Sequence, residues 1–147
     1  MIRACLVPFR RRPSSTARLL VAGQAPGIRV HTTGKPFNDP SGDRLRQWMG
    51  IDRETFYDRD RIAIAPMGFC FPGWTKDKGD LPPRRECREK WHDALFAAMP
   101  QIETVLMVGG YAQDYHFARL QVSSRKLPMT QVVRGWRDYA DLRPRLI

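Results

Sequence analysis

A glycine- and proline-rich stretch near the start of the chain holds the residues best suited to chemistry. It begins with Gly23-Gln24-Ala25-Pro26-Gly27 and continues through Thr33-Gly34-Lys35-Pro36-Phe37 to Ser41-Gly42. Glycine lets the backbone approach a ligand closely, and exposed N–H groups near Gln24 and Ala25 can donate hydrogen bonds to it. The first motif alone is a weak signal, because any tight turn after a strand can use it. Whether these residues form a site depends on the elements that position them.

Apolar runs alternate with helical patterns along the chain. Strands are predicted at residues 18–23, 61–65, 103–109 and 143–147. Helices are predicted at residues 42–49 with Ser41 as the N-cap, and at residues 83–99, 111–120 and 130–139. Continuous apolar strands are typical of a parallel sheet covered on both faces. The predicted fold is therefore α/β, a three-layer α/β/α sandwich around a central parallel sheet of about four strands.

Two long irregular loops directly follow strands, at residues 23–42 and 66–83. Ligands of such sheets bind beyond the carboxyl ends of the strands, and loops of this length in a compact domain are usually functional. We therefore predict the site between these two loops. The helix at residues 83–99 is expected to bury one face, formed by Trp91, Leu95, Ala98 and Met99.

The charge of the chain is strongly positive and uneven. Lys and Arg total 25 against 15 Asp and Glu, a net charge of +10, and no acid precedes Asp39. This balance suits a polyanionic partner such as DNA, with Arg10, Arg11 and Arg12 as candidate contacts to its phosphates. Solubility, a basic tail or a transit peptide are alternatives for this segment. We divide the chain into a basic segment, residues 1–17, and one domain, residues 18–147. No apolar run approaches the ~20 residues of a membrane helix.

Taken in order, the motifs resemble the uracil-DNA glycosylases, especially their iron–sulfur branch. There the first motif reads G-E-A/G-P-G and is followed by G-R-P-F and a small-residue turn into a helix. Residues 66–73 (PMGFCFPG) align with that branch's K-C-R-P-P segment, and residues 107–112 (MVGGYA) match its later strand–Gly–x–x–Ala turn. The resemblance spans about residues 18–147.

The resemblance implies a DNA-repair enzyme that hydrolyses the N-glycosidic bond of uracil or another deaminated base. Such an enzyme flips a nucleotide out of the stack and places fixed donors around the departing base anion. The loop Gly23–Gly27 would line the base pocket and Phe37 would stack on the base. Asn38 would supply a base-reading amide, or simply form the turn before Asp39-Pro40.

Three positions depart from the family pattern. Gln24 replaces the catalytic Glu, and an amide cannot act as a general base, so Asp39 or Asp43 becomes the candidate for activating water. Pro66 aligns with the Asn that reads uracil. The family's His-Pro-Ser motif would follow the fourth strand, where the sequence reaches only Leu146-Ile147, and we interpret His31, His92 and His116 as surface or helix residues. The alternative function is therefore a non-catalytic or truncated nucleic-acid-binding relative.

The chain has three cysteines, Cys5, Cys70 and Cys87. The resemblance assigns them to three of the four ligands of a [4Fe–4S] cluster, with Pro8 at the remaining position. Because four thiolates are the usual requirement, we predict that no stable cluster forms, the alternative being a cluster completed by a substitute ligand. Too few cysteines are present for a disulfide scaffold, so we expect a reducing, cytoplasmic environment, with DNA as partner, no membrane and a monomeric state.

Overall fold

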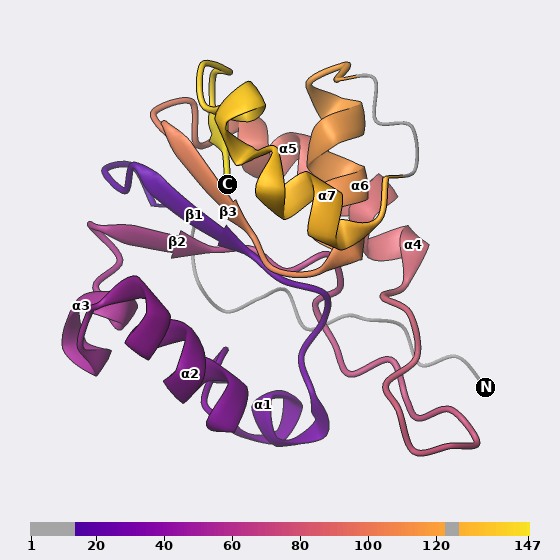
Figure 1. Ribbon diagram of the computed structural model, residues 1–147. Helices are drawn as coiled ribbons and strands as arrows, with labels where there is room; N and C mark the ends of the chain where they lie inside the picture. The colour runs from indigo at the N-terminus through magenta and orange to yellow at the C-terminus, as the bar shows by residue number, and fades with distance from the viewer. Residues whose placement is uncertain (1–13, 123–126) are drawn as a thin grey trace.

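The sheet of the protein is parallel throughout, as the sequence predicts. The structure is a computed structural model that describes residues 14–122 and 127–147. Within these residues four strands, β1 (Leu19–Ala22), β2 (Ile62–Ile64), β3 (Thr104–Met107) and β4 (Arg145–Leu146), form one sheet in the order β2-β1-β3-β4. Every neighbouring pair is parallel (Figure 1). β1 lies inside the sheet, which explains why its residues are almost all apolar.

Helices cover both faces of the sheet (Figure 1). One face carries α1 (Ile28–Thr33), α2 (Pro40–Met49) and α3 (Arg53–Tyr57). The other carries α4 (Arg85–Cys87), the π-helix η1 (Arg88–His92), α5 (Asp93–Ala97), α6 (Gly110–Arg119), α7 (Met129–Arg134) and the 3₁₀ helix η2 (Trp136–Tyr139). The predicted three-layer α/β/α arrangement is confirmed.

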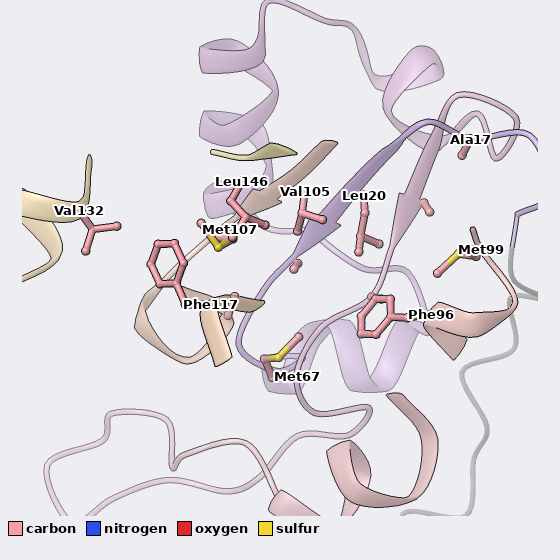
Figure 2. Close-up of a cluster of buried hydrophobic side chains, with 14 residues drawn as sticks. Ala17, Leu20, Met67, Phe96, Met99, Val105, Met107, Phe117, Val132 and Leu146 are labelled. Atoms are coloured by element: carbon pink, nitrogen blue, oxygen red, sulfur yellow. The ribbon is translucent and has the colours of Figure 1, made fainter. Parts of the chain in front are cut away.

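The alternation of side chains along β1 divides the interior into two cores. Leu20 and Ala22 point into the larger core, where Phe96, Phe117 and Val132 from the helical layer meet the strands (Figure 2). Val21 points the other way, into a smaller core with Leu45, Phe56 and Ile62 under α2 and α3. All three strand residues are fully buried. β1 is thus packed against side chains on both faces, so residues at its carboxyl end are held in fixed positions.

The predicted helix at residues 83–99 differs from the observed one in its start and in its buried face. It begins at Arg85 and passes through the π-helical turn η1, which adds a residue to the helical repeat. That insertion rotates the buried face, which is formed by Cys87, His92, Phe96 and Met99. Trp91, assigned to the buried face from its spacing, is 39% exposed.

Other helix ends also differ from the predictions. Asp39, not Ser41, is the N-cap of α2, because its carboxylate accepts from the N–H of Gly42 and Pro40 fits the first helical position. The predicted helix at residues 130–139 is interrupted at Gly135. α1 and α3 lie in segments for which no helix was predicted. No helix in the described part of the chain is long and apolar enough to cross a membrane.

Candidate functional site

A pocket of about 280 Å³ opens at the carboxyl ends of β1, β2 and β3. The whole first motif, from Gly23 to Gly27, lines it together with Phe37 and Asp39. Pro66 closes it on the side of β2, and Val108 and Gly109 on the side of β3. The chain leaves β1 toward β2 and returns on the opposite side with β3. The pocket therefore lies at the topological switch point, where open parallel sheets bind their ligands.

Backbone hydrogen bonds hold the first two loops together beyond the ends of the strands. The N–H groups of Met67 and Gly68 donate to the carbonyls of Gly23 and Gln24, at 2.8 and 2.9 Å. A Cβ on Gly68 would lie 3.2 Å from the Cβ of Pro83 and 3.3 Å from that of Ala25. The loops are therefore extensions of the β1–β2 ladder, and the wall of the pocket is fixed by main-chain contacts.

Phe37 is the aromatic residue of the pocket, and the structure holds it in an unusual conformation. Its φ is 53°, in the left-handed region that few non-glycine residues adopt. Its ring packs edge-on against Phe56, with ring centroids 5.8 Å apart. A Cβ on Gly23 would lie 3.1 Å from the tip of the Phe37 ring, so the first motif and the ring are closely packed.

Arg46 and Tyr57 fix the segment that carries Phe37, a role that the sequence analysis did not predict. The buried guanidinium of Arg46 donates to the carbonyl of Phe37 at 3.1 Å and pairs with Asp43 at 2.5 Å. The hydroxyl of Tyr57 donates to the carbonyl of Pro36 at 2.7 Å. Two consecutive carbonyls are therefore satisfied by side chains of α2 and α3, which lock the loop in place.

The carboxylate of Asp39 lies in the pocket wall but already has a structural role. Its Oδ1 accepts from the N–H of Gly42 at 2.9 Å and from the hydroxyl of Ser41 at 2.6 Å. Among the described residues, its second oxygen, Oδ2, has no hydrogen-bond partner. Asp39 thus combines an N-cap with one oxygen that can accept a hydrogen bond from a water or ligand.

Gln24 lies in the pocket wall, half-buried, where the family pattern has a Glu. Its side-chain Nε2 is 3.5 Å from the carbonyl oxygen of Leu81. Its main-chain carbonyl accepts from the N–H of Gly68. The amide is thus tied to the second loop by a donor that a carboxylate would lack. In this conformation Gln24 is a neutral polar wall of the pocket.

Two further candidates do not line the pocket. The side-chain oxygen of Asn38 accepts from the guanidinium of Arg53. Asp43 is held by Arg46 and lies 3.9 Å from Arg53, with its side chain 70% exposed. Both therefore support the loop and helix that surround Phe37 and are separate from the pocket wall.

His92 is a buried residue that the sequence interpretation missed. Its Nε2 lies 3.1 Å from the carbonyl of Pro66, which lines the pocket, and its Nδ1 lies 3.3 Å from the carbonyl of Cys87. Burial lowers the pKa of the ring, so it is neutral and donates to one of these carbonyls. His92, at the end of the π-helical turn Arg88–His92, thus joins the long helix to the second loop.

His116 is also fully buried, and neither ring nitrogen has a hydrogen-bond partner within the part of the chain that the structure describes. Its ring packs among Phe96 and Tyr115, at centroid distances of 5.2 and 5.0 Å. Burial, together with the nearby Arg119 and His92, lowers its pKa to about 3. His31 is exposed, and its Nδ1 accepts from the N–H of Phe71 at 3.4 Å. None of the three histidines lines the pocket.

The candidate metal ligands are placed only in part. Cys5 lies outside the described residues, as do Arg10, Arg11 and Arg12. Cys70 is half-buried and Cys87 is buried. Phe69, next to Cys70, stacks on the His92 ring that contacts Cys87. Over residues 14–122 and 127–147 no cluster of three His, Cys, Asp or Glu could hold a metal, so the described residues do not supply a cluster's ligand set.

The fold and the pocket together define an open α/β protein with a small binding site at the strand ends. Residues 10–142 match the family model described as the uracil DNA glycosylase superfamily. The match covers most of the chain, including all the loops of the pocket. The chain therefore belongs to the uracil DNA glycosylase superfamily.

Proposed function

We propose that the protein binds DNA and removes uracil, or another deaminated base, by hydrolysing its N-glycosidic bond. The observation that carries this proposal is the composition of the pocket, which unites the first motif, the Phe37 ring and the Asp39 carboxylate in about 280 Å³. This volume lies just below the usual range for drug-sized ligands and suits a single flipped base. Superfamily membership supports DNA as the substrate.

Each element of the pocket has a role in this reaction. The ring of Phe37 stacks on the flipped base, and backbone N–H groups of the first motif donate to a base carbonyl. Oδ2 of Asp39, or the amide of Gln24, orients the attacking water. The base leaves as an anion, so the fixed donors of the loop stabilise the transition state more than the substrate.

A second candidate function is binding of uracil-containing DNA without excision. Two observations favour it: Gln24 supplies an amide where the family has a carboxylate, and Asp39 is already engaged as an N-cap. Gln24 carries no charge, and only one carboxylate oxygen of Asp39 remains available to stabilise the developing sugar cation. We therefore expect the pocket to bind a base much better than it catalyses its release.

The rest of the molecule is proposed to support DNA binding. Arg10, Arg11 and Arg12 contact phosphates, so affinity falls steeply with rising salt and their replacement by Ala weakens binding equally for all sequences. We place the protein as a monomer in the reducing cytoplasm, where Cys70 remains a free thiol.

The testing experiment is excision from end-labelled oligonucleotides that carry one uracil, followed by alkaline cleavage of the abasic product. Binding is measured in parallel with the same oligonucleotide and with its thymine counterpart. We expect preferential binding to the uracil strand, lost in Phe37→Ala, and slow excision. Equal affinity of wild type and Phe37→Ala for both strands, with no excision, would rule out a base pocket.

A further inference from the structure

Residues 73–81 form a hairpin that projects beside the pocket, and we call them the 73–81 hairpin. Trp74 and Asp80 make an antiparallel bridge. The N–H of Leu81 donates to the carbonyl of Gly73 at 2.9 Å, and the N–H of Thr75 donates to that of Gly79 at 2.7 Å. In Figure 1 this part of the chain extends away from the sheet between β2 and α4. The hairpin is an ordered structure within a segment whose composition predicts an irregular loop.

The base of the hairpin is attached to the pocket. The carbonyl of Leu81, at its end, lies 3.5 Å from Nε2 of Gln24. Just before it, the N–H of Phe71 donates to His31 of α1. The hairpin therefore borders the mouth of the pocket and is connected to both sides of the first loop.

Trp74 presents a large ring to solvent at this position. Its side chain is 57% exposed, and its ring packs edge-on against Phe71 with centroids 4.9 Å apart at 66°. The contact with Phe71 positions the ring, and the backbone bridge to Asp80 fixes the chain that carries it, so the ring has less conformational freedom to lose when a ligand binds. Exposed, preorganised aromatic rings are what proteins use to stack the bases of single-stranded nucleic acids.

The charges of the 73–81 hairpin and of the segments next to it favour a polyanionic ligand. The hairpin and the residues after it carry Lys76, Lys78, Arg84 and Arg85 against Asp77, Asp80 and Glu86, and α1 and the turn after it add Arg29 and Lys35. The basic side chains thus outnumber the acidic ones in these segments. This excess of positive charge attracts the phosphates of a DNA strand, whereas it would not help to bind a protein partner with a purely apolar surface.

We propose that Trp74 stacks on an unpaired base of the DNA strand, next to the nucleotide whose base occupies the pocket. The inference rests on the proposed binding of DNA and assigns it a second contact outside the pocket. Extrusion of a nucleotide leaves its neighbours without a stacking partner, and an aromatic side chain at the mouth of the pocket replaces the lost contact. Phe71, in edge-on contact with the ring, positions it.

The test uses a labelled single-stranded thymine oligonucleotide, which contains no base to be excised, and measures affinity by fluorescence anisotropy. Trp74→Ala should bind about five- to a hundredfold more weakly than wild type, because one base loses its stacking partner. Trp74→Phe should retain most of the affinity. Trp48→Ala is the matched control: Trp48 is 76% exposed but lies at the other end of α2 from the pocket.

Stacking has a spectroscopic signature that a merely structural role would not give. The intrinsic tryptophan fluorescence of wild type should be quenched when the oligonucleotide binds, and Trp74→Phe should bind with much less quenching. Unchanged affinity in Trp74→Ala, or an equal loss in Trp48→Ala, would overturn the inference. If binding depends on Trp74 but wild type excises no uracil, the proposed activity is overturned and the inference about Trp74 stands. No binding of any oligonucleotide by wild type would overturn both.

Discussion

The carbonyl oxygen of Phe37 lies 1.8 Å from the place that a Cβ on Gly42 would occupy. The N–H of the same glycine donates to the carboxylate of Asp39. The first turn of α2 therefore runs directly against the backbone of the pocket's aromatic residue, and only a residue without a side chain fits there. Gly42 thus contacts both Phe37 and Asp39, the two residues of this loop that line the pocket.

Gly42→Ala is therefore expected to displace the Phe37 segment. The clash is with backbone, which cannot move away as a flexible side chain can, so unfolding free energy should fall by about 1–3 kcal/mol or more. Affinity for the uracil oligonucleotide should fall with it. Urea unfolding and anisotropy check both. Gly110→Ala is the control, because its Cβ would meet only the tip of Met129 at 3.8 Å. Equal stability of the two variants would contradict the close approach.

Arg46 should be as important for the pocket as any residue that lines it. Arg46→Met keeps an apolar side chain against Phe56 but leaves the carbonyl of Phe37 without its donor, and it removes the closer of the two guanidinium groups beside Asp43. Removing one member of a buried hydrogen-bonded pair costs about 1–3 kcal/mol or more. We expect weaker binding of the uracil oligonucleotide together with this loss of stability. Arg44→Met, an exposed change on the same helix, should alter neither, and a similar loss in both would contradict the role of Arg46.

His116 should make the stability of the protein depend on pH in the acidic range. Its folded-state pKa of about 3 lies below the ordinary 6.5, so between these values the unfolded chain binds the extra proton. The unfolding free energy therefore falls as pH drops below about 6.5, by at most about 1.4 kcal/mol per pH unit from this residue. His116→Phe should reduce this slope, and it should raise stability at pH 7 by removing unpaired buried nitrogens. If the unfolding free energies of wild type and His116→Phe had the same slope between pH 4 and 6, the low pKa of His116 would be refuted. Between pH 7 and 9, where His116 is largely neutral in either state, the two slopes should agree and serve as the internal control.

Protein purified without oxygen should be colourless and free of iron yet folded. The described residues offer only Cys70 and Cys87 as thiolates, and four are the usual requirement of a [4Fe–4S] cluster. Iron content and visible absorbance are the measurements, with circular dichroism as the control for folding. Stoichiometric iron that is lost in Cys70→Ser would show that a substitute ligand completes the cluster.

The sequence predicted the sheet and the location of the pocket, and the physical reason is the same for both. Buried parallel strands such as β1 are continuous apolar runs, and the glycine-rich motif follows β1 directly. Side-chain roles were less predictable. The burial of His92 depends on a π-turn that no simple periodicity reveals, and Arg46 has the residue type of a solvated helix face. The 73–81 hairpin was missed because its Gly, Lys and Asp residues indicate irregular structure, whereas its cross-strand hydrogen bonds are visible only in three dimensions.

Gln24→Glu should convert a weak catalyst into a better one. The carboxylate would stand in the pocket wall at the position where the family pattern has its acid, able to activate water and to stabilise the developing sugar cation. A single well-placed group of this kind is typically worth ~10²–10³ in rate. The gain is limited by the carbonyl of Leu81, which now accepts from the amide of Gln24 and would face a carboxylate instead. Single-turnover excision of uracil from a labelled strand measures the effect.

Gln24→Ala is the matched control for this change, since it removes the amide without adding a charge and should not accelerate excision. Asp39→Asn, which keeps one oxygen to accept from Gly42, tests whether Asp39 orients the water in either background. We expect wild type to release uracil slowly and Gln24→Glu to release it faster. Adding Asp39→Asn should lower the rate of release in either background. Rapid excision by wild type that is unaffected by Gln24→Glu but abolished by Asp39→Asn would overturn this expectation. It would mean that Oδ2 of Asp39 activates water while Oδ1 caps α2, so that one carboxylate serves both the fold and the reaction.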